Sequence, residues 1–132
     1  MTGKGYVARE GFRSTRIPVE YKAVYTVRKI TGEALITDIS EGGVALRVKQ
    51  ALSVGDIITL QSDISNNLTL KFKGEVRNVD GNIVGVMILE IDPELHRRFL
   101  EHIRGMLRMM NRSSTEKFRY AVQMIKKKSS KK

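Results

Sequence analysis

The segment Asp38-Ile39-Ser40-Glu41-Gly42-Gly43 combines a carboxylate, a hydroxyl and two adjacent glycines within six residues. A carboxylate accepts hydrogen bonds, a hydroxyl donates or accepts them, and glycine lets a ligand approach the backbone closely. The same residue types also build ordinary turns, because Asp and Ser bond the nearby backbone and Gly adopts positive φ. Taken alone, the segment therefore indicates a turn more strongly than a binding site.

Three arginines, Arg9, Arg13 and Arg16, precede that segment near the amino terminus. Arginine stays charged at physiological pH and presents a rigid fork of N–H donors. The alternative interpretation is a basic arm that is merely solvated. The arginines and the Asp-Ser-Gly segment together favour a ligand-binding site over an ordinary turn.

The sequence lacks the residues that most catalytic and metal sites need. It contains no cysteine, which excludes disulfides, thiolate zinc sites and cysteine nucleophiles. The two histidines, His96 and His102, are six residues apart and would face different directions on a helix, so we expect no shared metal. No Gly-Lys-Ser/Thr phosphate loop, strand-borne GxGxxG or elbow serine occurs. We therefore predict a binding protein rather than an enzyme, with no metal and no cofactor.

Alternating apolar residues predict the strands that position these side chains. The clearest alternation runs from Ile17 to Val27, with the period of two that is typical of a half-buried strand. Six strands are predicted, at residues 17–27, 34–39, 44–48, 57–61, 68–76 and 83–89. Since no helix separates them, they are expected to pair antiparallel and to remove their free edges by closing into a small barrel.

Short turns are predicted between these strands. We expect turns at Thr31-Gly32, at residues 41–43 and at Asp80-Gly81, the last being the strongest two-residue hairpin signal. Gly74 is expected to mark a bend or a bulge in the fifth strand.

The apolar period changes after Asp92, which is a good N-cap and precedes Pro93 at the first helical position. A helical stripe follows, formed by Leu95, Phe99, Ile103, Met106, Leu107 and Met110. Asn111 is expected to end this helix, and Ser113 with Glu116 forms a capping box for a second one. The predicted fold is mainly β with C-terminal α: a six-stranded antiparallel barrel closed by a helix, with a helical basic extension.

The net charge of +10 comes from the two ends of the 132-residue chain. Residues 93–132 carry 12 Lys and Arg against 3 Asp and Glu, residues 1–16 carry 4 against 1, and residues 17–92 carry 8 against 10. We divide the chain into a flexible basic ligand-binding arm (1–16), a barrel with its closing helix (17–110), and a helical extension with a disordered Lys tail (111–132). Neither a signal peptide nor a membrane span is predicted, so we expect a soluble cytoplasmic protein.

The basic extension has several interpretations. We favour a second helix over residues 114–125 that packs on the barrel or pairs with a copy in a homo-oligomer, followed by a solvated tail. A basic helix face would alternatively lie on an anionic membrane surface, or contact nucleic acid or an acidic protein. Nucleic acid is disfavoured because the barrel segment is slightly acidic and only 6% of the residues are aromatic.

With its N-terminal arginines and its Asp38–Gly43 segment, the sequence resembles the PilZ-domain family of bacterial cyclic di-GMP receptors. That family has an RxxxR motif just before the first strand and a DxSxxG motif between the second and third strands. Asp38, Ser40 and Gly43 match the second motif in full. The six strands and the helix from Pro93 also resemble the barrel and C-terminal helix of the family, over roughly residues 9–110.

The arginine motif allows two assignments. Arg9 and Arg13 have the literal RxxxR spacing, whereas Arg16 lies directly against the first strand, where the second arginine of the family usually stands. Four residues before Arg16 the sequence has Phe12, which cannot act as an arginine. The pair is therefore either Arg9 and Arg13 on a longer arm or Arg13 and Arg16 at a tighter spacing.

The resemblance implies cyclic di-GMP, which carries two phosphates and two guanines, as the ligand. Arginine pairs with phosphate oxygens or with guanine O6 and N7. Asp38 can accept from guanine N1–H and the amino group, Ser40 adds a hydroxyl, and Gly42 and Gly43 allow close approach.

The implied function is that of a single-domain receptor in second-messenger signalling, of the kind that regulates motility or biofilm formation. Binding would reposition the arm and present a new surface to a protein partner. The alternatives are a PilZ-like adaptor without ligand binding and a small basic barrel that binds nucleic acid.

Overall fold

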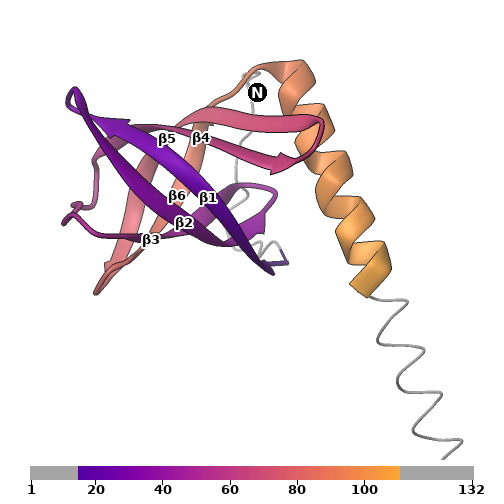
Figure 1. Ribbon diagram of the computed structural model, residues 1–132, viewed down its shortest axis with the longest axis horizontal. Coiled ribbons are helices and arrows are strands. Elements are labelled where there is room, and N and C mark those ends of the chain that lie inside the picture. The colour runs from indigo at the N-terminus through magenta and orange to yellow at the C-terminus, as the bar shows by residue number, and fades with distance from the viewer. Residues whose placement is uncertain (1–14, 111–132) are drawn as a thin grey trace, which may run out of the picture.

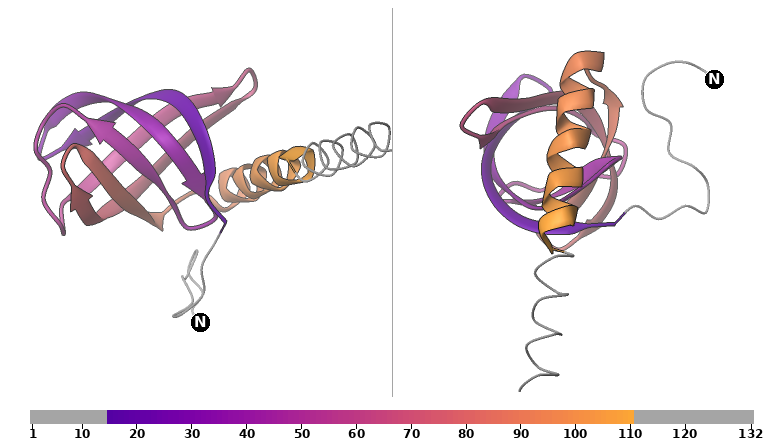
Figure 2. Two further views of the ribbon diagram at one scale, coloured as in Figure 1. Left: turned by 90° about the horizontal axis from the view of Figure 1, so that it is seen from below. Right: turned by 90° about the vertical axis from the view of Figure 1, so that its right-hand side faces the viewer.

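A computed structural model describes residues 15–110 of the protein, and these form a six-stranded closed barrel with a helix across one of its ends (Figures 1 and 2). The strands are β1 (Ile17–Val27), β2 (Ile30–Ser40), β3 (Gly43–Val48), β4 (Ile57–Ser65), β5 (Leu68–Asp80) and β6 (Ile83–Glu90). They follow one another around the barrel in the order β1-β2-β3-β6-β5-β4, and every pair of neighbours is antiparallel. The predicted fold class is confirmed.

Several predictions fall outside the described residues. These are the positions of Arg9 and Arg13, the end of the helix at Asn111, the second helix and the Lys tail. Within residues 15–110, no helix is long and apolar enough to cross a membrane.

The helix over residues 93–110 closes the barrel with the side chains predicted to do so. Phe99 and Ile103 are 0% and 1% exposed and join the core formed by the inward residues of the strands. Burying such side chains contributes about 2 kcal/mol each, so the helix is held by its apolar stripe. The stripe stops at Leu107, because Met110 is 40% exposed rather than packed. At the other end, Asp92 Oδ2 accepts from the backbone N–H of Leu95 at 3.0 Å, which confirms the N-cap.

The first hairpin turns earlier than the sequence predicted. Val27 pairs with Ile30, so the turn is Arg28-Lys29, and both residues have positive φ (48° and 67°), as a type I′ hairpin turn requires. Thr31-Gly32 lies within β2, and the predicted turn there is wrong. Gly32 serves packing instead, because a Cβ at this position would lie 2.6 Å from Cζ of the Tyr25 ring.

The structure also has the bulge predicted at Gly74 and the hairpin predicted at Asp80-Gly81, the latter shifted by one residue. The register between β5 and β6 changes between Lys73 and Gly74, which confirms the predicted bulge. Asp80 pairs with Ile83, so the last hairpin turns at Gly81-Asn82, one residue later than predicted. Gly81 has the positive φ (+64°) that this turn requires.

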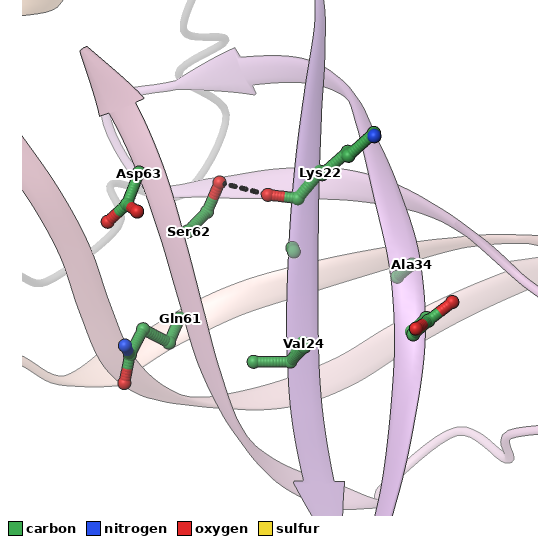
Figure 3. Close-up of a pocket in the computed structure, with 8 residues that line it drawn as sticks. Lys22, Val24, Ala34, Gln61, Ser62 and Asp63 are labelled. Atoms are coloured by element: carbon green, nitrogen blue, oxygen red, sulfur yellow. Dashed lines mark hydrogen bonds between the residues drawn. The ribbon is translucent and has the colours of Figure 1, made fainter. Parts of the chain in front are cut away.

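The barrel closes unevenly where β1 meets β4. Their register comprises three pairs, of which Val24 with Gln61 is the last toward the start of β1. Just beyond it, the buried Ser62 donates from Oγ to the carbonyl oxygen of Lys22 at 2.7 Å (Figure 3). A cavity of about 450 Å³ lies at this divergence, and we call it the seam cavity. Its lining residues are Lys22, Ala23, Val24, Glu33, Ala34, Gln61, Ser62 and Asp63.

Candidate functional site

The Asp-Ser-Gly segment forms the tight turn between β2 and β3. Ser40 ends β2 and pairs with Gly43 at the start of β3, and Ser40 Oγ donates to the Gly43 carbonyl oxygen at 3.3 Å. The carbonyl oxygen of Gly42 accepts from the backbone N–H of Ile88 on β6 at 2.8 Å. The turn is therefore attached to the neighbouring strand and holds a fixed backbone conformation.

Gly43 is required where β3 passes β6. A Cβ at Gly43 would lie 2.0 Å from the carbonyl oxygen of Val86, which is part of the opposite backbone and cannot move aside as a side chain would. Gly85, on β6, faces a side chain instead, since its Cβ would lie 2.7 Å from Oδ1 of Asn78. Because both strands carry glycine here, β3 and β6 pass close to each other and the Asn78 side chain packs over Gly85.

A bulge in β2 sets the position of Asp38. The register of β2 against β3 shifts between Ile36 and Asp38, and Asp38 pairs with Pro18 on β1 and with Ala45 on β3. The side chain of the extra residue, Thr37, donates to the carbonyl oxygen of Ala45 at 3.4 Å. Asp38 is half-buried. The bulge therefore interrupts the strict alternation of β2 immediately before the turn.

The predicted site residues that the structure describes meet in one groove. Its volume is about 240 Å³, and we call it the binding groove. Arg16, Asp38, Ser40, Gly42 and Gly43 all line it. Arg16 is exposed immediately before β1. Arg9 and Arg13 lie outside the described residues, so the choice between the two arginine pairs stays a prediction.

Sequence reasoning missed the far wall of this groove. Arg77 and Asn78 on β5 line it, as does Met87 on β6. Nη1 of Arg77 lies 3.3 Å from Sδ of Met87, to which it donates. A second register shift, between Val76 and Asn78, places Arg77 and Asn78 side by side at the groove. The available signal was two consecutive polar residues in an otherwise alternating strand, shortly before the glycine-containing segment of β6.

The groove is suited to recognition of an anion. Two permanent cations, Arg16 and Arg77, line it together with one carboxylate, Asp38. The described lining includes no histidine, lysine or cysteine; the residues in it of types that catalysis also uses are Asp38 and Ser40. Among residues 15–110 there is also no cluster of three or more His, Cys, Asp or Glu that could hold a metal ion. The arrangement offers hydrogen bonds and charge.

Comparison with known proteins places this barrel in a family. The sequence model of the PilZ domain matches residues 9–105. No curated protein sequence matches the chain significantly. Among solved structures, the chain is similar to the PilZ domain of YcgR from Escherichia coli with cyclic di-GMP, at a TM-score of 0.63 and 16% identity, covering 80% of this chain and 98% of that one.

Two longer proteins share the same fold. The complex of Escherichia coli YcgR with cyclic di-GMP has a TM-score of 0.68 and 15% identity, covering 81% of this chain and 50% of that one. The Bacillus subtilis inhibitor of motility MotI/DgrA has a TM-score of 0.63 and 17% identity, covering 76% of this chain and 53% of that one. The chain thus corresponds to about half of each of these proteins. At such identities the similarity shows a common fold.

Proposed function

The chain belongs to the PilZ domain family, and on that basis we propose that it is a cyclic di-GMP receptor whose ligand lies in the binding groove. One observation carries the proposal: Arg16 lines the same groove as Asp38, Ser40 and Gly43, which lie well downstream of it in the sequence. The PilZ domain of YcgR, which has the same fold, has a solved structure with cyclic di-GMP. That likeness supports the choice of ligand.

The predicted site residues that line the groove suit the groups of the ligand. The Asp38 carboxylate accepts from the N1–H and amino group of a guanine, and the Ser40 hydroxyl adds a polar contact. The guanidinium of Arg16 pairs with a phosphate oxygen or with guanine O6 and N7. Gly43 allows β3 to pass close to β6, which keeps the floor of the groove in place beneath the ligand.

The arm before β1 supplies the response in this proposal. Arg13, paired with either Arg9 or Arg16, would contact the ligand, and part of the interaction energy would be spent on repositioning the arm. The repositioned arm would then present a new surface to a protein partner. The groove itself is formed by the paired strands β2, β3, β5 and β6, so the barrel serves as the fixed half of the site.

Calorimetric titration of the full chain with cyclic di-GMP tests the proposal. Arg16→Ala and Asp38→Ala are each expected to weaken binding about tenfold or more, since each removes a charge-assisted hydrogen bond. Lys22→Ala and Asp63→Ala are the matched controls, because they remove the same charges at the seam cavity, and they should bind like the wild type. Circular dichroism should show the same barrel in all four variants.

Two results would contradict the proposal in different ways. A wild-type chain that gives no binding heat would remove the receptor function and leave the adaptor alternative. A wild-type chain that binds, with unchanged affinity in Arg16→Ala and Asp38→Ala, would place the ligand elsewhere on the molecule.

A further inference from the structure

Arg77 lies at the opposite end of the binding groove from Arg16. Around the barrel, the groove runs from Arg16, just before β1, across β2, β3 and β6 to Arg77 on β5. Asp38 and Ser40, the residues that suit a guanine, lie on β2, toward the Arg16 end. The β5 end therefore needs its own explanation.

Arg77 is a cation without an anionic partner among the described residues. In that part of the chain, ion pairs join Arg28 with Asp56 and Arg97 with two glutamates. The Arg77 side chain is exposed, and its hydrogen bond runs to the Met87 thioether, which is a weak acceptor. A guanidinium has five N–H donors, so most of the donor capacity of Arg77 remains available to a ligand.

The fold keeps Arg77 at the groove through local backbone geometry. The register shift between Val76 and Asn78 makes Arg77 the extra residue of a bulge, and bulges redirect side chains. The Asn78 amide lies over Gly85, where any larger residue would displace it. The described lining contributed by β5 is thus one guanidinium and one amide, with no carboxylate. Such a set can bind a phosphate, since both side chains donate hydrogen bonds and the described lining from β5 includes no carboxylate to repel the anion.

We propose that Arg77 binds the phosphate of the cyclic dinucleotide that lies farther from Arg16, exchanging its contact with Met87 for a bidentate contact with two phosphate oxygens. This inference rests on the proposed function and adds a residue to it. A ligand with two phosphates then meets one arginine at each end of the groove. Met87 holds the Arg77 side chain near its bound position before the ligand arrives, which reduces the ordering cost of binding.

The test is calorimetry of the full chain with cyclic di-GMP. Arg77→Met removes the charge and keeps a long unbranched side chain, and we expect the affinity to fall about tenfold or more. Arg77→Lys keeps the charge but loses the planar fork, so it should recover only part of the affinity. The matched control is Arg47→Met, which removes an exposed arginine of β3 that does not line the groove, and its affinity should equal that of the wild type.

A salt series separates a phosphate contact from a merely structural role. Screening weakens charge contacts, so the difference between wild type and Arg77→Met should shrink as ionic strength rises. A salt-independent loss, or an equal loss in Arg47→Met, would overturn the phosphate assignment. Unchanged affinity in Arg77→Met, with the wild type binding normally, would overturn the role of Arg77 and leave the proposed function intact. A wild type that does not bind would overturn both.

Discussion

The binding groove and the seam cavity are two depressions on one barrel, and the smaller one has the chemistry of a ligand site. The seam cavity has a volume of about 450 Å³ against about 240 Å³ for the groove. The charged residues of the seam cavity are Lys22, Glu33 and Asp63, two carboxylates with one cation. In the groove the ratio is reversed, with two arginines and one aspartate. A dianionic ligand is therefore attracted to the groove and repelled from the larger cavity.

The backbone differs between the two places as well. The groove has glycine at positions 42, 43 and 85, and two of them permit close packing, Gly43 against the Val86 backbone and Gly85 against the Asn78 side chain. At the seam, the one buried polar side chain, Ser62, already donates to the carbonyl oxygen of Lys22. The seam uses its polar group to close the barrel, whereas the groove keeps Arg16 and Arg77 available. Under the proposed function, charge rather than volume would direct the ligand to the groove.

The largest expected effect comes from filling the floor of the groove. In Gly43→Ala the new Cβ would lie 2.0 Å from the carbonyl oxygen of Val86. Strands β3 and β6 must separate to accommodate it, at a cost of about 3 kcal/mol in the free energy of unfolding. Urea denaturation followed by circular dichroism measures this loss. Unchanged stability would mean that the strands can yield here and that the groove floor is not fixed.

The control for Gly43→Ala is a glycine with open space. Gly105 lies in the C-terminal helix, and the nearest atom to its Cβ would be Nη2 of Arg108 at 4.0 Å. Gly105→Ala should therefore stabilise the protein by about 0.5 kcal/mol or more, because alanine costs less backbone entropy in a helix. Destabilisation by both alanines would indicate a general sensitivity to substitution instead of a close strand contact.

A smaller effect is expected from removing the hydroxyl that closes the seam. Ser62 is 3% exposed, and its loss in Ser62→Ala leaves the Lys22 carbonyl oxygen without this donor. We expect the free energy of unfolding to fall by about 1 kcal/mol, with the affinity for cyclic di-GMP unchanged. Ser65→Ala, which removes an exposed hydrogen bond to Asn67 on the same hairpin, should cost less. An affinity loss in a folded Ser62→Ala variant would show that the seam contributes to binding.

Local patterns were sufficient to predict the elements. The predicted bounds of β1 agree with the structure because one face of that strand is buried along its length and the alternation is continuous. The helix start was predictable because Asp92 and Pro93 act within a single turn. The first hairpin was not, since Arg28-Lys29 carries none of the usual signals for positive φ, while Thr31-Gly32 does.

In the candidate site, too, one part was predictable from local sequence and another part was not. Asp38, Ser40 and Gly43 belong to one turn, so a short motif was enough to single them out. Arg77 and Asn78 reach the groove only through a bulge in β5 opposite a glycine of β6. That placement depends on the register between β5 and β6. The alternation of apolar and polar residues does not show at which residue a bulge shifts that register.

The smallest expected effect concerns the part of β1 that runs past the seam. Tyr21 lies there, and its hydroxyl is 3.2 Å from Nε2 of His102 on the C-terminal helix. Burial lowers the pKa of His102, because the charged imidazolium loses hydration in the fold. The C-terminal helix therefore contacts this part of β1 through His102, whose burial costs less free energy when the imidazole is neutral.

The pH dependence follows from that sign. The folded state takes up a proton on His102 less readily than the unfolded chain, whose histidine has a pKa of about 6.5. The stability that this group contributes is complete above that value and is lost as the pH falls through the lowered pKa of the folded state. Urea titrations between pH 8 and 5 should therefore show a flatter decline in His102→Gln than in the wild type. Tyr21→Phe should keep the wild-type slope, since burial rather than the hydrogen bond lowers the pKa; a flattened slope in Tyr21→Phe would assign the effect to the bond instead.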